Sequence, residues 1–348
     1  MVILNILQAD EFTKKSKNNI VIDVRAPLEF NKGHIPGATN IPLFNDVERA
    51  AIGTLYKQSG RMDSVLYGLD VTGPKLKSFL EEIVSQKNAH PDQDILLHCA
   101  RGGLRSQSVA WLLEVAGLKA KILESGYKAY RGHVLSTFHK DYKIVLLSGE
   151  TGCGKTAILH ELKKNGEQII DLEGLANHKG SVFGGVGKTP QPTTQQFENN
   201  LAFELDKLDP TKRIWFENES PGIGSIHLPK DIVAQMRTAP IVQITVPAIE
   251  REKRIIREYG NFNIPEMEIL ITKLKKYLGG PNCEKAIEGL HSGNLHDTVS
   301  VLLSYYDKAY GHYQKKYNEK SVCFHEFEQD HPAENALAIS TSADKMAL

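Results

Sequence analysis

The chain has 348 residues, and its 42 Lys and Arg side chains are balanced by 42 Asp and Glu, so the formal net charge is zero. This length suits two domains, and the zero net charge excludes a protein that is basic throughout, so any nucleic-acid surface must be a local patch. The four cysteines lack the spacing of a disulfide or zinc framework. No stretch reads as a membrane span or a signal peptide. We therefore expect a cytoplasmic protein that does not enter the membrane, and we favour a monomer.

The first strong pattern lies near the N-terminus. Residues 20–24 form an apolar run that predicts a strand, and residues 33–42 form a turn rich in Gly and Pro. We interpret the polar side chains of this region as parts of the scaffold and not as catalysts, namely Asp23, Arg25, Glu29 and His34.

Cys99 is the most informative residue of the chain. Residues 95–98 predict a buried strand, and a helix is expected over about 106–116. A loop between a strand and a helix directs backbone N–H groups and the positive end of the helix dipole at its own side chains. Because Arg101 and Arg105 add two permanent cations, we predict that the pKa of the thiol is lowered and that Cys99 is a nucleophile.

Five residues separate Cys99 from Arg105. A loop of this length is able to curl around a tetrahedral oxyanion, with the arginine closing the ring. The arrangement permits transfer of sulfur or selenium through an adduct on the cysteine, and it equally permits attack on phosphorus. The spacing does not choose between them. The candidate catalytic residues are Cys99, Arg101, Gly102, Gly103 and Arg105.

The two patterns together resemble the rhodanese homology domain. The resemblance covers about residues 5–135, and it places Cys99 at the active-site position of that family. It implies a rhodanese-like domain, which we assign to residues 1–138.

A second motif follows directly. Residues 142–148 predict a strand, residues 149–156 match G-x-x-x-x-G-K-[ST], and a helical pattern covers 157–164. In such a loop the glycines let the backbone wrap a phosphate, the lysine supplies a charge and the threonine is able to hold Mg²⁺. The candidate phosphate-binding residues of this loop are Gly149, Gly152, Gly154, Lys155 and Thr156.

Further strands are predicted at 168–173, 213–219 and 240–246, alternating with helical segments. This alternation predicts a parallel sheet with helices on both faces. Asp171 and Glu217 lie at strand ends and would suit Mg²⁺ held through water, although a carboxylate at such a place is as often only solvated. We assign no cluster of direct metal ligands.

An arginine-rich helix is predicted at 250–260. Arg251, Arg254 and Arg257 recur on one side of it, as in the lid of small-molecule kinases, where arginines close over phosphates. The alternative is a solvated face, because acidic residues are interspersed. We include Arg251 and Arg254 among the candidate phosphate-binding residues.

Two other segments are unusual in composition. Residues 177–192 carry so many Gly and Pro residues that they predict a long functional or mobile loop. The last third mixes lysines with tyrosines, which suits a local RNA-binding patch or, for most of the tyrosines, the core of amphipathic helices. These residues are Lys273, Lys275, Lys276, Lys308, Lys315, Lys316, Tyr277, Tyr305, Tyr306, Tyr310, Tyr313 and Tyr317.

The complete arrangement resembles the tRNA 2-selenouridine synthases over nearly the full chain, through the motifs above and residues 171–181. The resemblance implies an α/β protein with a rhodanese-like domain followed, at residues 139–348, by a P-loop NTPase-like parallel-sheet domain with extra C-terminal helices. It implies an enzyme that replaces the 2-thio sulfur of the wobble uridine of tRNA with selenium. The implied co-substrates are selenophosphate, the selenium donor, and geranyl diphosphate, which alkylates the sulfur first.

The residues fit this chemistry. Selenophosphate is a tetrahedral oxyanion that suits the Cys99 loop, and the diphosphate suits the P-loop, where Lys155 and the Arg251 helix would stabilise the leaving pyrophosphate. The sequence leaves open whether the P-loop binds ATP instead and whether Cys99 forms a covalent selenium adduct. Three alternatives stay open: an ATP-dependent rhodanese-type sulfurtransferase, a C-x5-R phosphatase with a nucleotide-binding domain, and a non-catalytic RNA-binding module.

Overall fold

The computed structural model describes residues 5–259, 263–315 and 321–348. Lys316 and Tyr317 of the lysine and tyrosine set lie outside these residues. The chain divides into two compact units, residues 1–137 with 198–203, and residues 138–197 with 204–348. In the described part of the chain, no helix is both long and apolar enough to cross a membrane.

The first unit is built on a five-stranded parallel sheet with the order β1-β5-β4-β2-β3. Its strands are β1 (Asn5–Leu7), β2 (Ile20–Asp23), β3 (Thr39–Asn40), β4 (Ile95–His98) and β5 (Ala120–Leu123). Both central strands, β2 and β4, are buried along their whole length. Strands of a parallel sheet that are buried on both faces have continuous apolar sequences, and this is why the sequence analysis predicted the positions of β2 and β4.

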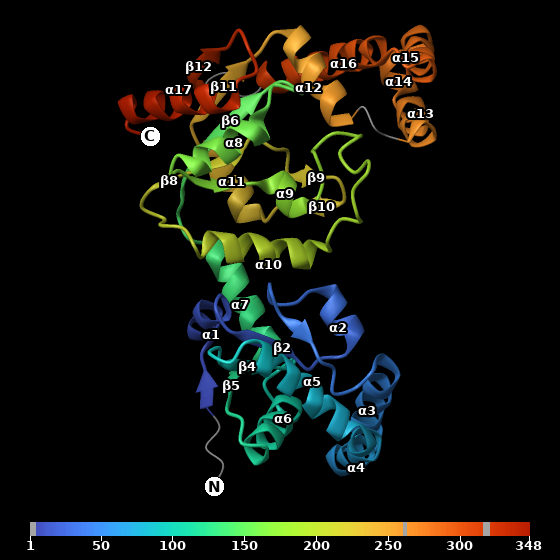
Figure 1. The fold of residues 1–348 in the computed structure, drawn as a ribbon, viewed down its shortest axis with the longest axis vertical. Coiled ribbons are helices and arrows are strands. Elements are labelled where there is room, and N and C mark those ends of the chain that lie inside the picture. Colours follow the sequence, from blue (N-terminus) through green and yellow to red (C-terminus); the bar gives the residue numbers. More distant parts are fainter. Residues whose placement is uncertain (1–4, 260–262, 316–320) are drawn as a thin grey trace. The chain divides into compact units, whose positions relative to one another are not determined.

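Seven helices accompany this sheet and appear in blue to green in Figure 1. They are α1 (Ala9–Ser16), α2 (Pro27–Lys32), α3 (Asp46–Gln58), α4 (Arg61–Thr72), α5 (Leu76–Ala89), α6 (Leu104–Val115) and α7 (Gly126–Phe138). A short 3₁₀ turn, Gly73–Lys75, joins α4 to α5. Helix α3 has a complete capping box, in which Asn45 accepts from the Glu48 N–H and Glu48 accepts from the Asn45 N–H.

The second unit holds another five-stranded parallel sheet, of order β12-β11-β6-β8-β7. Its strands are β6 (Lys143–Gly149), β7 (Gln168–Ile170), β8 (Arg213–Glu217), β11 (Ile241–Thr245) and β12 (Ser321–Glu326). The parallel sheet predicted here is confirmed. β12 was not predicted, and the segment after Ile170 turns into a helix where the sequence suggested that the strand continues. A separate hairpin pairs β9 (Gly222–Ile223) with β10 (Ile226–His227).

The helices of this unit form two groups. Around the sheet lie α8 (Lys155–Lys164), α9 (Leu172–Ala176), α11 (Lys230–Thr238), α12 (Ala248–Tyr259) and α17 (Pro332–Lys345). Helix α10 (Thr194–Leu205) is divided, because its residues 198–203 belong to the first unit. The extra helices expected near the C-terminus include α13 (Ile264–Lys273), α14 (Lys275–Leu278), α15 (Gly280–Ser292) and α16 (Leu295–Lys315). These four share one apolar core, and Phe183 and Val186 of the Gly-rich loop pack into it. The loop over residues 177–192 is thereby anchored.

A buried ion pair lies at the end of β2, beside the Cys99 strand. Asp23 is fully buried, and Arg25 donates to its carboxylate at 2.6 to 3.0 Å. The guanidinium also donates to the Gly33 carbonyl and lies 3.8 Å from the centre of the Tyr127 ring. Burial alone would raise the pKa of Asp23, but His98 and Arg25 hold it below its usual value. A buried carboxylate of this kind depends on its cation.

We expect Arg25→Met to lower the free energy of unfolding by about 3–5 kcal/mol, because it leaves the Asp23 carboxylate buried without its cation. Lys77→Met, which breaks the exposed pair with Glu81, is the control and should cost less than about 1 kcal/mol. Denaturant unfolding measures both changes.

The cost of Arg25→Met should depend on pH in a defined direction. In the wild type the folded-state pKa of Asp23 lies below the unfolded value of 3.8, so this residue stabilises the fold above that pH and loses the effect as the pH falls further. The folded state of Arg25→Met should be stabilised when Asp23 is protonated, because the uncompensated buried charge is then removed. The difference in free energy of unfolding between the wild type and Arg25→Met should therefore shrink below about pH 4. If this difference grows there instead, Asp23 is not the ionised partner of Arg25.

Candidate functional site

The Cys99 loop connects β4 to α6 and is held by a neighbouring turn. The N–H groups of Tyr127 and Lys128 donate to the carbonyl oxygens of Cys99 and Ala100 at 2.8 and 3.0 Å. Gly102 has a φ of +62°, and a Cβ at this position would come within 2.7 Å of the Ser125 nitrogen. The close approach of the turn therefore requires glycine at position 102. Gly103 is the N-cap residue of α6.

The Cys99 thiol is buried beneath this loop, with only 3% of the residue exposed. Its sulfur lies 3.3 Å from the Ser106 hydroxyl on α6. Burial raises the pKa of the thiol, but the Ser106 side chain, the Arg101 backbone N–H and the Arg105 charge together hold it below the usual value. The predicted direction of the pKa shift is confirmed, and Ser106, which the sequence analysis did not single out, is its largest favourable cause.

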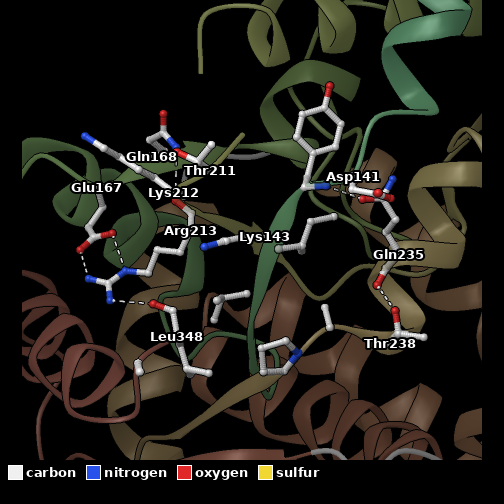
Figure 2. A pocket seen from close by; sticks show the side chains of 16 residues that line it. Asp141, Lys143, Glu167, Gln168, Thr211, Lys212, Arg213, Gln235, Thr238 and Leu348 are labelled. Atoms are coloured by element: carbon white, nitrogen blue, oxygen red, sulfur yellow. Dashed lines mark hydrogen bonds and ion pairs between the residues drawn. The ribbon is translucent and has the colours of Figure 1, made fainter. Parts of the chain in front are cut away.

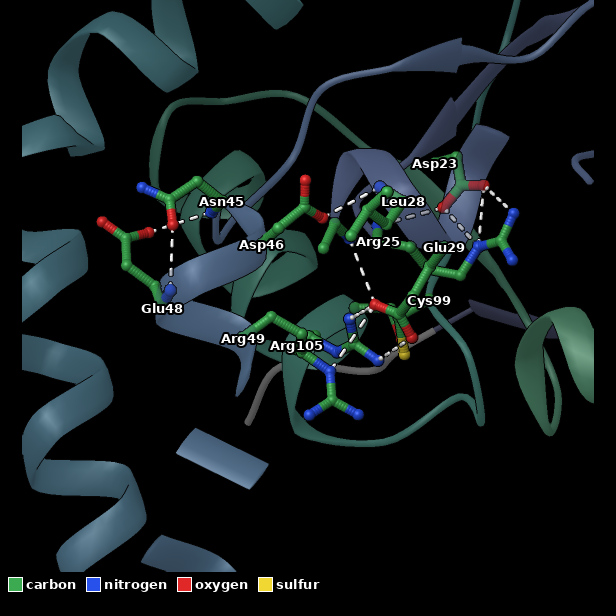
Figure 3. Close-up of polar contacts among 12 residues, drawn as sticks. Asp23, Arg25, Leu28, Glu29, Asn45, Asp46, Glu48, Arg49, Cys99 and Arg105 are labelled. Carbon is green, nitrogen blue, oxygen red and sulfur yellow. Dashed lines mark hydrogen bonds and ion pairs between the residues drawn. The ribbon is translucent and has the colours of Figure 1, made fainter. Parts of the chain in front are cut away.

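The two arginines of the loop differ in their surroundings. Arg101 is exposed. Arg105 is bound to Glu29 of α2, with its Nη1 donating at 2.7 Å, and Arg49 of α3 lies 3.5 Å from the same carboxylate (Figure 3). Although burial raises the pKa of Glu29, its cationic partners keep it below the ordinary value. Glu29 therefore stays ionised, and an oxyanion in the loop must compete with it for Arg105.

The second loop, residues 149–156, connects β6 to α8. Gly152 and Gly154 both have a φ of +82°, and a Cβ on Gly154 would come within 2.9 Å of the Arg254 guanidinium. The Lys155 ammonium donates to the Gly149 carbonyl at 2.7 Å. Burial would lower the pKa of Lys155, but the neighbouring Cys153, Glu219 and Glu173 raise it. Lys155 is therefore a permanent cation at the base of the loop.

Acidic side chains gather opposite the lysine, at the carboxyl ends of β7 and β8. The Thr156 hydroxyl donates to Glu217 at 2.6 Å. Burial and repulsion between neighbouring carboxylates raise the pKa values of Glu173 and Glu217. Asp171 instead caps α9 through the Gly174 N–H and contacts His160 at 2.9 Å. In the part of the chain that the structure describes, no cluster of three or more acidic, His or Cys residues is arranged to hold a metal ion.

The arginines of α12 are already paired. Arg251 is 4% exposed, and both of its terminal nitrogens donate to Asp307 of α16 at 2.8 Å. Arg254 donates to Asp330 at 2.8 Å and lies 3.4 Å from Glu258. Arg254 lines the cavity above the P-loop, whereas Arg251 is not among the lining residues. Direct contact of either residue with phosphate stays a prediction.

A cavity of about 650 Å³ covers the P-loop. The predicted residues on its wall are Gly149, Gly152, Gly154, Lys155, Thr156 and Arg254, and the further polar residues include Lys179, Lys188, Glu219, Tyr306 and Tyr310. Lys188 comes from the Gly-rich loop over residues 177–192, which the sequence analysis predicted to be functional or mobile. Tyr306 and Tyr310 come from α16, and the sequence analysis assigned such tyrosines to an RNA-binding patch or to the core of amphipathic helices, not to a phosphate site.

A second cavity, of about 320 Å³, adjoins the first. The two share Thr151, Ser181, Ile255 and Tyr306 on their walls. The other lining residues are mainly aliphatic and come from α12, α13, α15 and α16, among them Ile256, Met267, Leu290, Val299, Leu302 and Leu303. A polar, cation-bearing cavity therefore meets an apolar one beside the P-loop.

A third cavity, of about 790 Å³, lies at the opposite edge of the same sheet, where β6, β7 and β8 begin (Figure 2). Its buried polar groups are bound to one another. Arg213 is held by Glu167 and Asp344, and the Gln235 side chain accepts from the Tyr142 N–H at 2.9 Å.

Comparison with known proteins identifies both halves of the chain. A family model described as a rhodanese-like domain matches residues 8–133, and one described as the tRNA 2-selenouridine synthase AAA domain matches residues 142–268. These matches agree with the two folds expected from the sequence.

Relatives named tRNA 2-selenouridine synthase match across both halves. One from a Sulfurovum species is 36% identical over 91% of this chain and 94% of the relative. One from Pseudomonas fluorescens is 40% identical over 81% of this chain and 78% of the relative. For one from Nitrosomonas europaea, 37% identical, the match spans 63% of the relative. The chain belongs to the tRNA 2-selenouridine synthase family.

Proposed function

We propose that this enzyme converts 2-thiouridine at the wobble position of tRNA into 2-selenouridine in two steps, and that geranyl diphosphate for the first step binds across the two adjoining cavities of the second unit. The observation that carries the proposal is the junction of the P-loop cavity with an aliphatic cavity. A prenyl diphosphate has the same two parts, a diphosphate and a hydrocarbon chain. The base of ATP would bury its hydrogen-bonding groups against aliphatic walls without partners, which is costly.

In the first step the sulfur of the thiouridine forms a bond to the first carbon of the geranyl chain. The bond between this carbon and the diphosphate breaks, and its electron pair leaves with the diphosphate. The uracil N3 proton passes to solvent, so the S-geranyl product is neutral. Lys155, a permanent cation at the base of the cavity, stabilises the charge on the leaving diphosphate. The Thr156 hydroxyl and the Glu217 carboxylate are oxygen ligands of the type that Mg²⁺ takes, and the ion would neutralise part of the same charge.

In the second step selenophosphate occupies the Cys99 loop. Selenium bonds to C2 of the alkylated base, and the sulfur leaves as geranylthiol after taking a proton. Water then cleaves the bond between phosphorus and selenium, which releases phosphate. The support for this placement is the buried thiol of lowered pKa beside Ser106 and Arg105. Cys99 either carries the selenium covalently or orients its donor.

The partners follow from this chemistry. The tRNA is bound through phosphate contacts, for which the exposed Lys273, Lys275 and Lys276 are candidates. We place the reaction in the cytoplasm and assign it to a monomer. All four cysteines are free, which suits a reducing compartment.

Cys99→Ser should abolish selenium incorporation and leave geranylation intact, because an alcohol is far less acidic and less nucleophilic than this thiol. Mass spectrometry of tRNA nucleosides, after incubation with selenophosphate and geranyl diphosphate, measures both products. Cys323→Ser is the control, since this cysteine lies in β12 outside both loops and burial raises the pKa of its thiol. Full selenation by the Cys99 variant would refute its assignment.

Lys155→Ala should lower geranylation by about a hundredfold or more, because a charge-assisted contact to the diphosphate is lost. The same variant should still selenate tRNA that has been geranylated beforehand. Unchanged geranylation would remove the P-loop from the reaction. ATP hydrolysis by the wild type that disappears in this variant would favour the ATP-dependent alternative.

Val299→Phe tests the aliphatic cavity. The phenyl ring, larger than the valine side chain, fills part of the space for the geranyl chain. The value of kcat/KM for geranyl diphosphate should therefore fall at least about tenfold, and that for the five-carbon dimethylallyl diphosphate should fall less. Val301→Phe, on the same helix but not among the cavity residues, should leave the ratio of the two substrates unchanged. An equal loss of kcat/KM for both substrates in the Val299 variant would mean that the geranyl chain does not bind in this cavity.

A further inference from the structure

Helix α16 passes along both cavities of the second unit, and its lining residues change in character along the way. Val299, Leu302 and Leu303 face the aliphatic cavity, and Tyr310 faces the P-loop cavity. Tyr306 lies between them in sequence and lines both. Tyr306 therefore marks the place where the polar space passes into the apolar one.

The hydroxyl groups of the two cavity tyrosines differ. The Tyr310 hydroxyl donates to Gln243 at 2.8 Å and lies 2.8 Å from the Ser148 hydroxyl, so it is already satisfied. The Tyr306 hydroxyl is buried and, within the described residues, forms no hydrogen bond of ordinary geometry. The Ser181 side chain and the Val182 backbone lower the pKa of the phenol, as donors to its oxygen do, so they do not provide the acceptor that the phenol's own proton needs.

A buried hydroxyl without a partner is costly and rare in folded proteins, and it needs a physical reason. Burial raises the pKa of Tyr306 to about 12, so the phenol keeps its proton at neutral pH and is able to donate a hydrogen bond. An acceptor that arrives with a ligand at the junction of the cavities would satisfy it.

We propose that Tyr306 is a catalytic residue of the alkylation step, in which its hydroxyl donates a hydrogen bond to the oxygen that bridges the geranyl chain and the diphosphate. This inference rests on the proposed function. With the diphosphate over the P-loop and the chain in the aliphatic cavity, the bridging oxygen is the atom that lies at the junction. The residue with an unsatisfied donor lies at the same place.

The contribution of this bond follows from where charge develops. When the bond between the first carbon and the bridging oxygen breaks, the electron pair stays on that oxygen while the sulfur bonds to the carbon. A donor aimed at this oxygen is worth more in the transition state than in the bound substrate, so it raises kcat and leaves KM little changed. The Tyr306 proton stays on the phenol throughout.

Tyr306→Phe tests the proposal because it removes only the hydroxyl. The expected result is a fall in kcat for geranylation of about tenfold to a hundredfold, with KM for geranyl diphosphate changed less than about threefold. Tyr305→Phe is the matched control, since Tyr305 precedes it on the same helix and is not among the residues of either cavity. The control should keep the wild-type kcat, and thermal unfolding should show both variants folded.

Two outcomes would overturn the inference while the wild type still geranylates tRNA. One is an unchanged kcat in Tyr306→Phe, and the other is a rise in KM alone, which would make Tyr306 a binding residue for the chain. If the wild type forms no geranylated tRNA at all, the proposed function fails and this inference fails with it. Selenation of tRNA geranylated beforehand should proceed at the wild-type rate in Tyr306→Phe.

Discussion

Three arginines at the two candidate sites are bound to carboxylates that the fold brings to them, and the shape of both sites depends on these ion pairs. Arg105 is bound by Glu29, Arg251 by Asp307 and Arg254 by Asp330. Breaking a buried pair by removal of one partner costs far more than the pair contributes. The pairs therefore keep the two loops in shape, and an incoming oxyanion must take the place of a carboxylate or bind beside it.

The two sites meet this constraint differently. In the first unit the thiol lies under its loop, and its pKa is lowered by a hydroxyl and a backbone N–H as well as by an arginine. In the second unit Lys155 donates to neutral backbone carbonyls, and its raised pKa keeps it charged, so it attracts a phosphate that carries its own negative charge. Both loops begin at the carboxyl end of a central parallel strand, the edge at which ligands bind in open α/β sheets.

The aliphatic cavity gives the second site a property that a nucleotide-binding loop alone does not have. Its walls come mainly from α12, α13, α15 and α16, which lie between β11 and β12 in the chain, together with Phe183 from the Gly-rich loop. The Gly-rich loop also supplies Ser181 and Lys188 to the P-loop cavity. One segment thus contributes to both cavities, which accounts for its length without regular structure.

The sequence by itself determined the two loops, the parallel strands in front of them and the family resemblance, because these depend on local patterns: apolar runs, glycines at fixed spacing, and a cysteine before them or a lysine after them. It also predicted a long loop at 177–192, either functional or mobile, and the extra helices. Only the tertiary structure decided which charges are neutralised, since Glu29 and Arg105 are 76 residues apart and Arg251 and Asp307 are 56 apart. The same holds for β12, which pairs with β11 across the sheet edge, and for Tyr306, whose place between two cavities depends on helices packing from distant parts of the chain. Local patterns carry no information about such pairings, because these form only when the chain folds.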